Sequence, residues 1–383
     1  MNSQLKSLRY AAGSLLVVGL GGTELTGLER AWLRLVRPGG VILFKRNVTD
    51  AAQARALLDE VTGLGVPNAV RCVDVEGGTV NRLRDALAAL PSAQAVGAAA
   101  RKLRKPALAY EHGELIARAV KAFGFNTTLA PVVDLALPEA ADVLGSRPPG
   151  ANAAEVVDYA RPYLAALAAN GIVGCGKHFP GLGGASGDTH FVTPQIMRTW
   201  KQIWNEDLVP YRELHTAMPM IMMNHAAYPA TPGKHEPASA SRFWITAILK
   251  KKIGYRGIIL SDDLEMGGIL KFLPVDEAAV AAVRAGSDLL EICHSAELIL
   301  RSYEALIRAA ERSAAFRTLL LTRAREVERK RARLYSGGIA CALTAKQIES
   351  LRDQILKFGD RVKAATTAAD VIDPRAISPA ETS

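Results

Sequence analysis

Residues 257–263 read GIILSDD, a short apolar run that ends in a serine and two adjacent carboxylates. Continuous rather than alternating hydrophobicity indicates a β-strand that is buried on both faces, as in a parallel sheet. Seven further runs of this kind occur along the chain, and most of them end in polar residues. The eight runs are Leu15–Leu20, Val41–Phe44, Ala69–Val73, Leu129–Val133, Ile172–Cys175, Met218–Met223, Gly257–Leu260 and Asp288–Ile292.

Segments with helical periodicity lie between most of these runs, for example Ala51–Leu64, Tyr110–Phe123, Ala153–Asn170 and Pro274–Ala285. Eight strands that alternate with helices predict an α/β fold, a single (β/α)₈ TIM-type barrel. We expect the barrel to occupy residues 1–340. Residues 341–383 are expected to form a short C-terminal helical extension and a frayed tail.

The chain carries 47 Lys and Arg against 38 Asp and Glu, a net charge of +9. A basic balance favours anionic partners such as nucleic acid, acidic membranes or acidic small substrates. However, the arginines of residues 301–333 recur at helical spacing with glutamates between them, which is typical of a solvated helix face. No known nucleic-acid motif accompanies them. We therefore expect no nucleic-acid partner.

The four cysteines, Cys72, Cys175, Cys293 and Cys341, form no C-x-x-C pair. Their placement predicts free thiols in a reducing compartment, hence a cytoplasmic protein, and disfavours zinc.

The N-terminal apolar run Tyr10–Leu20 follows two basic residues and has the length of a signal peptide. Because Leu15–Leu20 also fits a buried strand, and no small-x-small cleavage site follows, we favour the strand. No apolar run reaches the ~18 residues that a spanning helix needs, so we expect no membrane span.

Active sites of (β/α)₈ barrels lie where the strands end. We therefore expect the residues that follow the eight runs to converge on one polar, sugar-sized pocket. Strand ends are also polar simply because they meet water, but that explains less well a set this rich in Asp, His and Lys. The set comprises Lys45, Arg46, Asn47, Asp74, Glu76, Asp134, Lys177, His178, Asn224, His225, Asp262, Asp263 and His294.

Asp262 and Asp263 directly follow the seventh run. Adjacent carboxylates at the end of a buried strand are costly unless they are paired or hydrogen-bonded. We expect one to be a nucleophile and the other a structural acceptor. Alternatively, both cap the next helix.

Asp188 and His190 are two residues apart, so on an extended segment they point the same way. The aspartate would then fix the imidazole tautomer and make His190 a proton shuttle. Glycines between residues 181 and 187 would let this segment swing over a substrate. The alternatives are an ordinary surface pair and an ordinary rim loop.

Lys177 and His178 end the fifth run. Lys177 is a candidate donor to substrate hydroxyls, or else forms a salt bridge to Asp134 or Asp74. Asp74 precedes a Gly-Gly pair, which suits either a bidentate acceptor for sugar hydroxyls or a tight turn. Arg147 lies on a long insertion after the fourth run, where it either binds an acceptor group or covers the pocket.

Together these residues resemble glycoside hydrolase family 3, and within it the single-domain bacterial β-N-acetylglucosaminidases. The resemblance runs from about Leu15 to His294. The segments that carry it are GGVILFKRN at 39–47, DVEGG at 74–78, LAPVVD at 129–134, KHFPGLGGASGDTH at 177–190 and SD at 261–262.

The resemblance implies a retaining exo-β-N-acetylglucosaminidase with Asp262 as nucleophile and His190, oriented by Asp188, as acid/base. It implies no metal and no organic cofactor. The implied substrate is a GlcNAc-terminated glycan or muropeptide from cell-wall recycling, and the implied assembly is a monomer or weak oligomer. The sugar-contacting positions fall on Asp74, Arg82, Arg147, Lys177, His178 and His225.

The chain departs from the family pattern at Leu182, Thr189 and Pro148-Pro149. The Leu and Pro changes fall on loops around the sugar and the acceptor side, so they bear on the aglycone preference. Three alternatives stay open. They are a phosphorylase of the same fold, a β-glucosidase or β-xylosidase, and a non-catalytic sugar-binding barrel.

Overall fold

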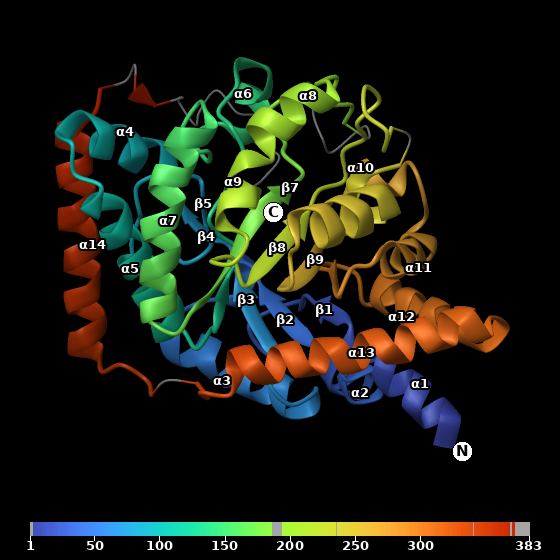
Figure 1. Ribbon diagram of the computed structural model, residues 1–383. Coiled ribbons are helices and arrows are strands. Elements are labelled where there is room, and N and C mark those ends of the chain that lie inside the picture. Colours follow the sequence, from blue (N-terminus) through green and yellow to red (C-terminus); the bar gives the residue numbers. More distant parts are fainter. Residues whose placement is uncertain (1–2, 186–193, 235, 340, 368–369, 372–383) are drawn as a thin grey trace.

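A computed structural model describes residues 3–185, 194–234, 236–339, 341–367 and 370–371. Eight parallel strands form a closed barrel in the order β1-β10-β9-β8-β7-β6-β3-β2, surrounded by helices (Figure 1). The predicted (β/α)₈ architecture is confirmed. The barrel strands are β1 (Leu16–Val18), β2 (Gly40–Leu43), β3 (Val70–Val73), β6 (Thr127–Thr128), β7 (Val173–Phe179), β8 (Met220–Met223), β9 (Ile258–Asp263) and β10 (Leu289–Ile292).

A two-stranded antiparallel hairpin follows β3 and consists of β4 (Val75–Gly77) and β5 (Val80–Asn81). The α-helices are α1 (Ser3–Ser14), α2 (Gly27–Val36), α3 (Ala51–Leu64), α4 (Ala93–Leu103), α5 (Ala107–Ala122), α6 (Ala141–Leu144), α7 (Ala153–Ala169), α8 (Trp200–Gln202), α9 (Val209–Leu214), α10 (Gly267–Leu270), α11 (Val275–Ala285), α12 (Ala296–Arg312), α13 (Ala314–Tyr335) and α14 (Ala345–Ala365). Short 3₁₀ turns span Lys45–Asn47, Pro138–Ala140 and Ala238–Ala240, and π-helical segments span Ile203–Asp207 and Phe243–Ile253.

The fourth barrel strand differs from its prediction. It is β6, two threonines that precede the predicted run Leu129–Val133. Pro131 offers no N–H to a ladder, so regular pairing ends before it. The threonine hydroxyls are satisfied inside the barrel, since Thr127 Oγ1 bonds Tyr335 Oη at 2.9 Å and Thr128 Oγ1 donates to Val75 O at 3.2 Å. A polar strand with internal partners leaves no apolar signal in the sequence.

Helices α1 and α13 pack together across the N-terminal ends of the strands (Figure 1). Gly39 N donates to Gly13 O at 3.1 Å, and Arg331 Nη1 donates to Gly39 O at 2.8 Å. A Cβ at Gly39 would lie 2.1 Å from Ser14 O, so this contact requires glycine. The apolar N-terminal segment is therefore a helix followed by strand β1. The opposite end of the barrel, where the strands finish, is left for the polar residues.

Helix α14 packs on α4 and α5 at the side of the barrel (Figure 1). Phe358 of α14 stacks on His112 of α5 with ring centroids 5.7 Å apart. Burial lowers the pKa of His112 to about 3, so its ring is neutral, and its Nδ1 bonds Tyr159 Oη at 2.8 Å. A Cβ on Gly77 would lie 3.1 Å from His112 Nε2, so the ring lies directly against the β4–β5 hairpin.

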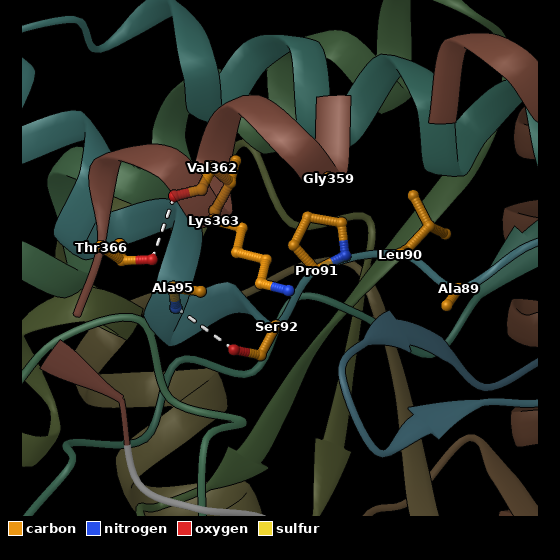
Figure 2. Close-up of a pocket in the computed structure, with 9 residues that line it drawn as sticks. All are labelled: Ala89, Leu90, Pro91, Ser92, Ala95, Gly359, Val362, Lys363 and Thr366. Atoms are coloured by element: carbon orange, nitrogen blue, oxygen red, sulfur yellow. Dashed lines mark hydrogen bonds between the residues drawn. The ribbon is translucent and has the colours of Figure 1, made fainter. Parts of the chain in front are cut away.

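A cavity of about 300 Å³ lies between α14 and α4, on the outside of the barrel (Figure 2). The Lys363 side chain extends across it between Pro91 and Ser92. The cavity therefore lies apart from the strand ends. Its lining residues are Ala89, Leu90, Pro91, Ser92, Ala95, Gly359, Val362, Lys363 and Thr366.

Within the part of the chain that the structure describes, no helix combines the length and the apolar character needed to cross a bilayer.

Candidate active site

Lys177 projects from β7 into the barrel and is almost fully buried. Its Nζ lies 2.7 Å from Asp74 Oδ1, just after β3, and 2.6 Å from Glu76 Oε1 in β4. The salt bridge to Asp74, one of the alternatives that the sequence left open, is therefore present. Because both acceptors are predicted rim residues, the ion pair also brings the ends of β3 and β7 together.

Arg147, on the long insertion after β6, donates to both carboxylate oxygens of Glu76. Nε donates to Oε2 and Nη2 donates to Oε1, both at 2.9 Å, the planar two-point geometry that suits a guanidinium. Burial alone would raise the pKa of Glu76, but Arg147 and Lys177 outweigh it and hold that pKa far below its usual range. Burial likewise would lower the pKa of Lys177, and Asp74 and Glu76 raise it instead.

His178, next along β7, is held between an acid and a cation. Its Nδ1 lies 2.7 Å from Asp134 Oδ2, and Arg147 Nη2 lies 3.1 Å from its Nε2. A guanidinium can only donate, so Nε2 accepts and Nδ1–H donates to Asp134. Asp134 also accepts from the backbone N–H of Leu182 at 2.8 Å. Asp134 therefore fixes the tautomer of His178.

Asp134→Asn is expected to lower the free energy of unfolding by about 1.5–3 kcal/mol, the value of a hydrogen bond to a charged group. The backbone donors keep the amide oxygen, so the amide NH₂ faces His178 Nδ1. The ring then carries its proton on Nε2, opposite an Arg147 N–H. Urea unfolding measures the loss. In an Arg147→Met background no N–H group faces Nε2, so Asp134→Asn should lower the free energy of unfolding by less than it does in the wild type. An equal loss in both backgrounds would contradict the tautomer argument.

Asp262 and Asp263 end β9 but differ in their surroundings. Asp263 Oδ1 accepts from Glu265 N at 3.0 Å, and Asp263 Oδ2 lies 3.4 Å from His294 Nε2. The only hydrogen bond to the Asp262 carboxylate within the described residues comes from Asp263 N, at 2.9 Å. Helix α10 has Met266 as its N-cap, so neither aspartate caps it.

His225, predicted to contact the sugar, uses both ring nitrogens within the protein. Nε2 donates to Asp263 O at 2.9 Å, and Nδ1 accepts from Ser239 Oγ at 2.7 Å. Burial lowers its pKa, so the ring is neutral. In this arrangement His225 supports the end of β9 and has no ring nitrogen left for a ligand.

Arg82 lies on the Asp74 side of the rim. Its backbone N–H donates to Asp74 O at 3.0 Å, and its guanidinium lies over the Phe44 ring, 5.8 Å from the centroid. Arg46 lies over the same ring at 4.6 Å, with Nη2 bonded to Cys293 O. The two guanidinium groups and the ring together border the site beside β2.

Asp188 and His190 lie outside the described residues. The glycines that precede them were predicted to supply mobility, but Gly183 and Gly184 are tightly packed. A Cβ would lie 2.7 Å from Leu135 O at Gly183 and 2.6 Å from Arg198 Cδ at Gly184. Close approach accounts for these two glycines better than flexibility does.

Sequence reasoning placed Glu76, Asp134 and Asn224 at strand ends and named Asp134 only as an alternative salt-bridge partner of Lys177. Asn224 Nδ2 donates to His178 O at 3.0 Å and so supports the strand that carries Lys177. Glu291 was missed altogether, because it lies within an apolar run. In the described part of the chain, no group of three or more His, Cys, Asp or Glu side chains is arranged to hold a metal ion.

The sequence matches the family described as glycosyl hydrolase family 3 N terminal domain over residues 7–329. It is 38% identical to a beta-hexosaminidase of Chromobacterium violaceum over 284 residues, 73% of this chain and 79% of the relative.

Two solved structures resemble it closely. A family 3 beta-N-acetylglucosaminidase from Paenibacillus sp. str. FPU-7 superposes with a TM-score of 0.80 at 29% identity, covering 92% of this chain and 68% of that one. NagZ from Neisseria gonorrhoeae, in complex with N-trifluoroacetyl-D-glucosamine, superposes with a TM-score of 0.70 at 29% identity, covering 82% of this chain and 98% of that one.

Proposed function

The chain belongs to glycosyl hydrolase family 3, and from this premise we propose that it is a retaining exo-β-N-acetylglucosaminidase. The observation that carries the proposal is the pairing of two features at the barrel rim. One is Asp262, whose carboxylate is little engaged by the described residues. The other is the closed network that joins Asp74, Lys177, Glu76 and Arg147.

In the proposed reaction, Asp262 attacks the anomeric carbon and the bond to the aglycone oxygen breaks. His190 donates a proton to that oxygen and then removes one from the water that hydrolyses the glycosyl-aspartate ester. Asp188 orients the imidazole. Retaining glycosidases usually employ two carboxylates about 5–5.5 Å apart. A histidine with its own aspartate takes the place of one of them here.

The rim network is proposed to bind the sugar hydroxyls. Asp74 offers carboxylate acceptors, whereas Lys177 and Arg147 offer charged donors, and hydrogen bonds with a charged partner are the stronger kind. Since the side chains already hold one another in place, little conformational entropy remains to be lost when a sugar binds. His178, with its tautomer fixed by Asp134, belongs to the same surface.

His190→Ala is expected to lower kcat/KM by about 10²–10⁴-fold on glycosides with poor leaving groups, because their oxygen needs a proton. Glycosides of very acidic phenols need none and should lose far less. The comparison uses kcat/KM because it reports the steps up to the covalent intermediate. Equal losses on both kinds of substrate would remove His190 from the acid/base role.

Three alternatives have their own tests. A phosphorylase would turn over an aryl GlcNAc glycoside faster with phosphate and release a sugar phosphate. A β-glucosidase or β-xylosidase would prefer aryl glycosides that lack the C2 acetamido group. A non-catalytic sugar-binding barrel would release no aryl group at all.

We further propose that the substrate is a GlcNAc-terminated glycan or muropeptide met in the cytoplasm during cell-wall recycling, and that the protein is a monomer or weak oligomer. The four free thiols support a reducing compartment. A relative solved with an N-acylated glucosamine supports the sugar. The substrate proposal is tested by measuring GlcNAc release from purified muropeptides and comparing it with release from the intact cell-wall polymer.

A further inference from the structure

Glu291 lies inside the barrel on β10, beside the strand end that carries the proposed nucleophile. Its backbone N–H donates to Ser261 Oγ at 3.0 Å, and its carbonyl accepts from Leu264 N at 3.0 Å. These two bonds flank Asp262 and Asp263 on both sides. Any change in the environment of Glu291 therefore bears directly on the end of β9.

The Glu291 side chain is 2% exposed. Among the described residues, its carboxyl group has one hydrogen-bond donor, the weakly donating thiol of Cys72, with Sγ 3.9 Å from Oε1. An ionised carboxylate in such surroundings lacks the partners that offset its desolvation. Burial, and after it the charges of Asp74, Asp262 and Asp263, raise the pKa of Glu291 well above its usual range.

Several titratable groups surround this carboxyl. Strand β3 and the residues after it supply Cys72 and Asp74, β7 supplies Cys175 and Lys177, and β9 supplies Asp262 and Asp263, while Cys293 follows on its own chain segment. Lys177 is the one cation among them, and it is already bonded to Asp74 and Glu76. An ionised Glu291 would compete with those two carboxylates for the same ammonium group.

We propose that Glu291 is a positioning residue: an uncharged acid whose neutrality leaves Lys177 committed to Asp74 and Glu76, and whose ionisation weakens sugar binding. The inference rests on the proposed role of Lys177 in holding the sugar. Burying this carboxyl group destabilises the fold, and the proposal gives that group a function in the site. Destabilising features of this kind are commonly found at functional sites.

The first experiment measures the neutrality of Glu291. The unfolded chain loses this proton near pH 4.3, whereas the folded protein keeps it, so the stability of the wild type falls as the pH rises above that value. Glu291→Gln removes the loss. Its Tm should exceed that of the wild type by a margin at least about 3 °C larger at pH 8 than at pH 5. A margin independent of pH would show that Glu291 is charged in the folded protein, and would overturn the proposal.

The second experiment measures GlcNAc binding by calorimetry, because binding of the product needs no proton transfer. The wild-type Kd should rise about fivefold or more as the pH is raised and Glu291 ionises, whereas the Kd of Glu291→Gln should stay flat over the same pH range. Glu297→Gln, which removes the same charge at an exposed position on α12, should keep the wild-type profile.

The outcomes separate two failures. If GlcNAc binds but the wild type and Glu291→Gln give the same profile, or if Glu297→Gln flattens it as well, the role of Glu291 is refuted and the proposed function stands. If Glu291→Gln, which carries no charge at this position at any pH, does not bind GlcNAc, the proposed function fails and takes this role with it.

Discussion

Asp262→Ala should lower kcat/KM for an aryl β-GlcNAc glycoside by a factor on the order of 10⁴ or more, because the covalent intermediate can no longer form. Asp263→Asn should cost much less. The Asp263 carboxylate contacts Glu265 N and His294, so we expect it to hold the rim in place. A slow 2-fluoro or 5-fluoro glycoside should label one peptide through Asp262.

Two further measurements keep this assignment falsifiable. Azide should restore turnover of Asp262→Ala and yield a glycosyl azide of inverted configuration, since a small anion takes the place of the missing carboxylate. Circular dichroism should show a folded barrel. A fluoroglycoside label on Asp263 or Glu265 would move the nucleophile to that residue.

Lys177→Met should lower the free energy of unfolding by about 3–5 kcal/mol, because it leaves Asp74 buried without its cation and Glu76 with Arg147 as its remaining cation. In the wild type the depressed pKa of Glu76 contributes stability that is present above its unfolded pKa of about 4.3 and is lost as the pH falls through the folded pKa. The difference between wild type and variant should therefore be largest above about pH 5 and shrink below it.

Lys45→Met is the matched control for that experiment. Lys45 forms an ion pair of the same length, 2.7 Å, with Asp85, but both side chains are mostly exposed. Such an exposed pair contributes little to stability, because water screens both charges. Urea unfolding of the wild type and both variants at two pH values gives the loss of unfolding free energy for each variant at each pH. Similar losses for Lys177 and Lys45, or a Lys177 loss that grows at acid pH, would contradict the account of the buried network.

Local pattern was enough to predict most of the barrel. Residues 51–64 have helical periodicity and form α3 as predicted, and the run at 257–263 continues as a strand into its two aspartates. The failure at β6 has a local cause as well. Thr127 and Thr128 take their partners from Tyr335 and Val75, and one of these lies more than 200 residues away.

The candidate site was harder to predict, because its geometry depends on contacts between distant segments. Strand-end position predicted that Asp74 and Lys177 lie on one rim, and Arg147 was expected at the pocket from the long insertion after the fourth run. Strand-end position did not predict that Glu76 joins two cations, nor that Asp134 orients His178. The bonds from Arg147 to Glu76 and from His178 to Asp134 connect residues 71 and 44 positions apart. Glu291 gave no signal, because a single acid within an apolar run has the same pattern as a strand with one exposed residue.

The match to the family ends at residue 329, whereas Phe358 belongs to α14. Through His112, this helix contacts the hairpin that carries Glu76. Helix α14 therefore has a structural route to the proposed sugar site, through His112 and the β4–β5 hairpin. Substitutions along one face of α14 can shift or loosen the hairpin while every residue at the rim stays the same.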